Sequence, residues 1–173
     1  MRITPLVLGA ALATQACSPY SISGPRPPSL PLFGPARADV ATICVVRSAV
    51  MASAVTFIVH DNGKLVGATR GQSYFCYEAA PGMHAIVSQT FDSTDTPGSL
   101  QLEVAAGRRY YVAQEHEGVA SLTSVLAQID PDIAGERCAS CVHRALTDAP
   151  GHEQVPPAVP FAPAADLRAS AAR

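Results

Sequence analysis

The chain has 173 residues with a formal net charge of −2, and 48% of its residues are hydrophobic. It is long enough for one domain with its own core, and it lacks the basic surface that nucleic-acid binding requires. Its prolines are unevenly spread: residues 17–38 contain six, 148–173 contain five, and the longer stretch 39–147 contains three. Proline cannot donate to a sheet ladder and breaks helices. We therefore predict a domain over 39–147, between a Pro-rich tether at 17–38 and a disordered Pro/Ala-rich tail at 148–173.

Residues 1–16 have the pattern of an export signal. One arginine precedes an apolar run, Ile3–Ala13, that is too short to cross a bilayer as a helix. Small residues before the next cysteine suit cleavage after Ala16, and Cys17 then becomes the first mature residue. This arrangement resembles the bacterial lipobox, in which that thiol takes a diacylglyceryl chain. We predict a signal peptide over 1–16 and lipidation of Cys17, with plain secretion to the periplasm as the alternative.

The residue after this cysteine bears on where a lipoprotein would go. Ser18 is not the aspartate that resembles an inner-membrane retention signal, so we expect a lipid-anchored protein of the outer membrane. A Pro-rich segment such as 17–38 is extended and semi-rigid. It would hold the domain a few nanometres from the bilayer.

Seven strands are predicted within 39–147, because short runs rich in β-branched and aromatic residues alternate with turn signals. They are Thr42–Arg47, Val55–His60, Lys64–Thr69, Ser73–Glu78, Met83–Phe91, Leu100–Val104 and Arg109–Glu115. Asp61-Asn62-Gly63 tolerates the positive φ of a tight hairpin, and Pro81-Gly82 fits a type II turn. This spacing is typical of an all-β fold, and we predict an antiparallel β-sandwich.

The pattern changes after the seventh strand. Val119–Ile129 is ambiguous, since several of its apolar residues have helical spacing. Asp130-Pro131 then matches a helix N-cap followed by proline at the first helical position. We predict a short C-terminal helix over 131–146 that covers an open face or edge of the sheet.

Several of these pieces together resemble a known family. They are the D-x-G-K-x-V-G pattern at Asp61–Gly67, the aromatic strand Ser73–Tyr77, Pro81-Gly82-x-His84, the alternating run Leu100–Gly107, and Tyr110–Val112. Their order resembles an uncharacterised domain of bacterial lipoproteins, similar to PEGA-like and transthyretin-like sandwiches, and covers about residues 41–146. The resemblance implies a compact β-sandwich behind a lipobox. It implies no functional residue, because the family has no established chemistry.

The cysteines are the strongest candidates for covalent chemistry. With Cys17 lipidated, four remain in an oxidising compartment, and we predict that Cys44, Cys76, Cys138 and Cys141 form two structural disulfides. Three connectivities are possible. Since a bridge between Cys138 and Cys141 inside a helix would be strained, bridges from strand to helix are favoured. The alternative is a thiol-redox or metal-binding protein that uses Cys138 and Cys141.

No catalytic pattern is recognised in the remaining sequence. The five histidines are scattered, and no serine lies in a Gly-x-Ser-x-Gly motif. The aromatic residues are expected to pack in the core, with a glycan-binding face as the alternative; they are Tyr74, Phe75, Tyr77, Tyr110 and Tyr111. We therefore predict a non-enzymatic, lipid-anchored envelope module without a cofactor or metal. Its expected partners are the membrane, through the lipid, and an unidentified envelope protein or glycan.

Overall fold

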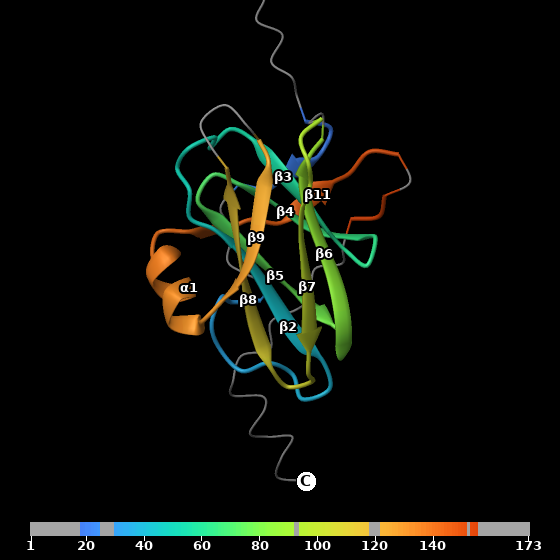
Figure 1. The fold of residues 1–173 in the computed structure, drawn as a ribbon, viewed down its shortest axis with the longest axis vertical. Coiled ribbons are helices and arrows are strands. Elements are labelled where there is room, and N and C mark those ends of the chain that lie inside the picture. The colour runs from blue at the N-terminus through green and yellow to red at the C-terminus, as the bar shows by residue number, and fades with distance from the viewer. Residues whose placement is uncertain (1–17, 25–29, 92–93, 118–121, 152, 156–173) are drawn as a thin grey trace, which may run out of the picture.

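The computed structural model describes residues 18–24, 30–91, 94–117, 122–151 and 153–155. Within them the chain is mainly β, and its two larger sheets face each other (Figure 1). The five-stranded sheet has the order β10 (Val142–His143), β5 (Ser73–Ala79), β2 (Ala41–Arg47), β8 (Arg109–His116), β9 (Ser124–Ile129). The four-stranded sheet has the order β4 (Lys64–Arg70), β3 (Thr56–Asp61), β6 (Gly82–Thr90), β7 (Gly98–Val104). The prediction of an all-β fold is confirmed.

The larger sheet differs from the expected antiparallel pattern. Two of its four neighbouring pairs, β2 with β5 and β8 with β9, are antiparallel, but β2 runs parallel to β8, and β10 runs parallel to β5. The central strand β2 therefore lies between two strands that are distant from it in sequence. The sandwich is mixed on this side and antiparallel on the other.

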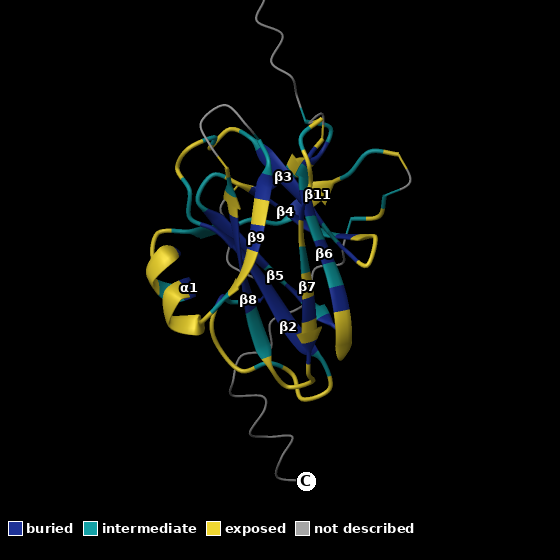
Figure 2. Cartoon of the chain, viewed as in Figure 1, coloured by how far each residue is buried: buried dark blue, intermediate teal, exposed yellow. Residues whose placement is uncertain are grey.

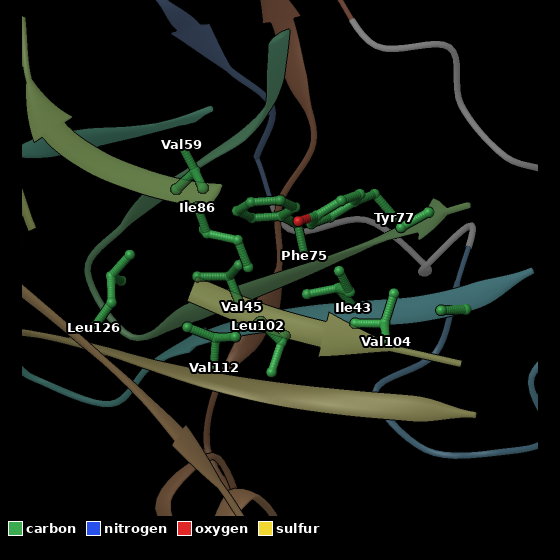
Figure 3. Close-up of a cluster of buried hydrophobic side chains, with 12 residues drawn as sticks. Ile43, Val45, Val59, Phe75, Tyr77, Ile86, Leu102, Val104, Val112 and Leu126 are labelled. Carbon is green, nitrogen blue, oxygen red and sulfur yellow. The ribbon is translucent and has the colours of Figure 1, made fainter. Parts of the chain in front are cut away.

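The main core lies between the two sheets. Ile43 and Val45 of the larger sheet face Val59 and Ile86 of the smaller one, and Phe75 packs among them (Figure 3). Strand β2 is buried along its whole length (Figure 2). Its alternate residues face a second cluster on the outer side of the sheet, where α1 (Pro131–Arg137) and a segment around Leu32 cover it.

The N-terminal segment corrects the prediction of an extended tether over 17–38. Strand β1 (Ser21–Ile22) pairs with β11 (Leu146–Asp148), and Tyr20 packs with Leu146 against the outer face of the smaller sheet. Leu30 and Leu32 are also buried. Proline removes backbone donors but leaves carbonyl acceptors and apolar neighbours, so a Pro-rich segment can still be bound through both. The folded unit therefore extends beyond 39–147, while 1–17 and 156–173 lie outside the described residues.

Two elements after β8 also differ from expectation. The ambiguous stretch ends in a strand, β9, because its residues from Ser124 complete a ladder along β8. The helix begins at Pro131 as predicted but stops at Arg137 rather than 146. The chain then turns, and β10 adds to the edge of the sheet beside β5. Pairing with an existing sheet edge thus replaces the last turns of the expected helix.

The predicted hairpin is present between β3 and β4. Asn62 and Gly63 both have positive φ, 48° and 78°, as a two-residue hairpin turn requires. The Asn62 side chain also accepts a hydrogen bond from the backbone N–H of Ala85 at 3.0 Å. The turn is therefore fixed to the start of β6 as well as to its own strands.

Candidate functional site

The four domain cysteines form two disulfides, with a connectivity other than the one favoured above. Cys44 of β2 lies directly opposite Cys76 of β5 and is bonded to it, with a Cα–Cα distance of 4.0 Å. Cys138 is bonded to Cys141, at a Cα–Cα distance of 4.7 Å. The expectation of strand-to-helix bridges is wrong because the helix ends before Cys138, so the second bridge spans a turn instead of a helix.

A half-buried arginine covers the first disulfide. Arg109 Nη1 donates to the carbonyl oxygens of Pro31 at 2.6 Å and Leu32 at 3.2 Å, and it lies 3.3 Å from Cys44 Sγ. Burial lowers the pKa of this guanidinium. Its hydrogen bonds fasten the Pro-rich segment over the sulfur atoms. The bridge is therefore enclosed by the chain, and sequence reasoning gave no sign of the role of Arg109.

The second disulfide lies at the wrong end of its helix for redox catalysis. Cys138 follows the last residue of α1, and its backbone N–H bonds to Ala134 O. Reactive Cys-x-x-Cys motifs use a helix N-terminus, whose positive dipole end favours a thiolate. Cys138 instead follows the C-terminal end of the helix, whose partial negative charge disfavours a thiolate. The geometry therefore favours a structural role for the Cys138–Cys141 bridge.

A buried carboxylate joins three strands near the β3–β4 hairpin. Asp61 Oδ2 accepts a hydrogen bond from Tyr77 Oη at 3.0 Å and lies 2.6 Å from His84 Nδ1. The other ring nitrogen of His84 lies 2.8 Å from the carbonyl oxygen of Ala80. Both ring nitrogens of His84 therefore face oxygen atoms, one from a side chain and one from the backbone.

This cluster is closed off from solvent. Asp61, Tyr77 and His84 are all buried. Burial, together with the nearby Asp61 charge, raises the pKa of the Tyr77 hydroxyl, so it stays a donor. Asp61 Oδ1 has no hydrogen-bond partner among the described residues. The sequence indicated Asp61 only as a turn residue, because no local pattern shows that β5 and β6 approach it.

A second carboxylate ties both ends of the described chain to β3. Glu153 Oε1 lies 2.7 Å from His60 Nε2, and Glu153 Oε2 accepts a hydrogen bond from Tyr20 Oη. Partial burial acts to raise the pKa of Glu153, but the hydrogen bonds and the charge of His60 outweigh it, and the pKa is lowered. Burial and the same contact raise the pKa of Tyr20 to about 12. Through Tyr20 and His60, Glu153 links the small β1–β11 sheet to strand β3 of the sandwich.

We expect Glu153→Gln to lower the melting temperature at neutral pH, and the difference from wild type to shrink in acid. The folded-state pKa of Glu153 is depressed, so its contribution is present above the unfolded pKa and is lost as pH falls through the folded value. Thermal unfolding across a pH series measures this. Glu136→Gln, on the exposed face of α1, is the matched control. A difference that stays constant from neutral pH into acid would contradict the assignment.

A buried arginine holds the loop between β2 and β3. Arg47 donates to the carbonyl oxygens of Val55 at 3.0 Å, Met51 at 3.2 Å and Ala52 at 2.9 Å. Its guanidinium also lies 4.7 Å from the centre of the Phe57 ring. Burial lowers its pKa to about 10, so it remains charged at neutral pH. The arginine therefore fixes loop 48–55 from beneath.

A buried polar network lies in the main core, at the end nearest loop 48–55. The Gln114 side chain accepts a hydrogen bond from Thr69 and donates one to Ser88. Ser124 Oγ lies 2.9 Å from Ser88 Oγ. All four side chains are buried, and each has its partner inside the sandwich. The network joins the two sheets. We infer that it fixes how they are positioned relative to each other.

The other sequence candidates do not converge on a site. Tyr74, Phe75, Tyr77 and Tyr111 are buried, so the described part of the chain presents no stacking face from them. His143 packs against Tyr74, with ring centroids 5.5 Å apart. No group of three or more metal-ligating side chains occurs within the described ranges. Cys17 and His152 lie outside those ranges.

Comparison with protein-family models and with curated proteins gave no match to this chain. In the part of the chain that the structure describes, no helix combines the length and apolar character needed to cross a membrane.

Proposed function

We propose that this protein is an exported, lipid-anchored envelope protein whose β-sandwich serves as a non-enzymatic interaction or structural module. The observation that carries the proposal is the pairing of all four domain cysteines in two disulfides. Such bridges persist in oxidising compartments and are rare in the cytosol. They agree with an export signal that ends at Ala16 and is followed by Cys17, where the lipobox-like pattern provides the acceptor thiol.

The polar clusters support a structural module. The Asp61, Gln114 and Arg47 clusters each take their partners from several strands or loops of the same sandwich. Buried polar groups held by several elements in this way fix strand register and loop position. We therefore assign their role to the rigidity of the domain.

Cys17→Ser is expected to move the protein from the membrane fraction to the soluble periplasmic fraction. The substitution removes the thiol that would carry the diacylglyceryl chain and leaves the folded domain intact. Fractionation combined with intact-protein mass spectrometry measures both location and acyl mass. Ser18→Ala, which leaves the thiol in place, is the control and should remain acylated. A wild-type protein without acyl mass would overturn the proposal.

A further inference from the structure

The folded domain begins very close to the proposed lipid. Tyr20 is buried, and its ring packs against Phe91 with centroids 5.9 Å apart. Its hydroxyl donates to Glu153, so the residue is held at both its ring and its polar end. Only three residue steps separate Tyr20 from Cys17. A fully extended chain covers about 3.6 Å per residue, so the two Cα atoms are at most about 11 Å apart.

This attachment identifies one end of the sandwich. Strands β3 and β6 are antiparallel, with Phe57 opposite Thr90. The loop that precedes β3 and the loop that follows β6 therefore leave the sheet at the same end. Phe91, which Tyr20 contacts, begins the second of these loops. Figure 1 shows the first described residues, in blue, beside that loop at the top of the molecule.

The same end presents apolar side chains to solvent. Val50 is 68% exposed, Met51 53% and Phe91 49%. Loop 48–55 is held in place, because Arg47 donates hydrogen bonds to three of its carbonyl groups. The exposure of Val50 and Met51 is therefore not the result of a loosely held loop. Large apolar side chains held rigidly outward are typical of an interaction surface.

We infer that this end of the sandwich lies against the phospholipid bilayer, with Val50, Met51 and Phe91 inserted at the boundary between headgroups and acyl chains. The inference rests on the proposed lipidation of Cys17, which leaves no spacer between bilayer and domain. The charged residues at the same end include both signs, Asp95 and Glu117 in loops and the exposed Arg70 at the end of β4, so the contact depends on apolar insertion and not on anionic lipid. The opposite end, where β6 begins near Met83, faces away from the membrane.

The absence of tryptophan from the sequence permits a direct test. Met51→Trp and Met83→Trp each place a single fluorescent reporter, at the membrane end and at the opposite end. Met83 is 59% exposed, so the two positions are matched in accessibility. Each full-length acylated protein is reconstituted into phosphatidylcholine vesicles with brominated acyl chains, which quench tryptophan on contact. We expect loss of fluorescence from the reporter at 51 and none from the reporter at 83, both unchanged by added salt.

The outcomes separate this inference from the proposed function. Mass spectrometry of each preparation first establishes whether Cys17 carries acyl chains. An acylated protein in which both reporters or neither are quenched, or in which only the reporter at 83 is quenched, overturns the orientation but leaves the lipid anchor standing. A protein that carries no acyl chain overturns the proposed function and the orientation together.

Discussion

Replacing both Cys44 and Cys76 by alanine is expected to cause one of the two largest losses of stability in this domain. The bridge spans a sequence separation of 32 residues, and restriction of the unfolded chain by a loop of that size corresponds to about 4 kcal/mol. A single domain is held folded by roughly 5–15 kcal/mol. The double variant should therefore melt at a much lower temperature, as measured by calorimetry or circular dichroism.

The second disulfide supplies the matched comparison. Cys138→Ala with Cys141→Ala opens a loop with a separation of only three residues, for which the same relation gives about 2 kcal/mol. Thiol counting completes the experiment: no cysteine of the domain should be alkylated until the protein is denatured and reduced. Two thiols that react readily in the folded protein, at 138 and 141, would instead support the redox alternative.

Asp61→Ala is expected to destabilise the domain by about 2–6 kcal/mol, because it leaves the buried Tyr77 hydroxyl and the buried His84 ring nitrogen without their partner, at about 1–3 kcal/mol each. The loss would appear in urea-induced unfolding as a lower midpoint at an unchanged slope. Tyr77→Phe removes only one hydrogen bond to the same carboxylate and should cost about 1 kcal/mol.

Asp39→Ala is the control for this prediction. Asp39 pairs with Arg37 at the surface, and both side chains are more than half exposed. Exposed ion pairs contribute little to stability, so we expect no measurable change. Equal effects at positions 39 and 61 would contradict the stabilising role of the buried Asp61–His84 contact.

Sequence reasoning predicted the features that depend on neighbouring residues. The strand runs and the Asn62-Gly63 hairpin follow from local conformational preferences, and so does the helix start at Pro131. The even number of domain cysteines, in a chain expected to be exported, also indicated two disulfides. These predictions needed no knowledge of which strands pair.

Other features depend on contacts between distant parts of the chain. The opposition of Cys44 and Cys76 follows from the pairing of β2 with β5, which no local pattern specifies. The role of Asp61 depends on residues from β5 and β6. Binding of the Pro-rich segment depends on Arg109, more than 70 residues later in the sequence. Composition alone could indicate only that this segment lacks backbone donors.

The position of β2 has a consequence for the order in which the chain folds. This strand, complete by Arg47, pairs with β5 and, in parallel, with β8, which ends at His116. Sheets built from such distant pairings form slowly, on the order of milliseconds to seconds, because long loops must close before the contacts are gained. If the chain is exported as proposed, one edge of β2 therefore stays unpaired until β8 has followed it through the export channel. During that interval the apolar strand can pair with another chain, so the early translocated half is the segment for which a periplasmic chaperone would matter most.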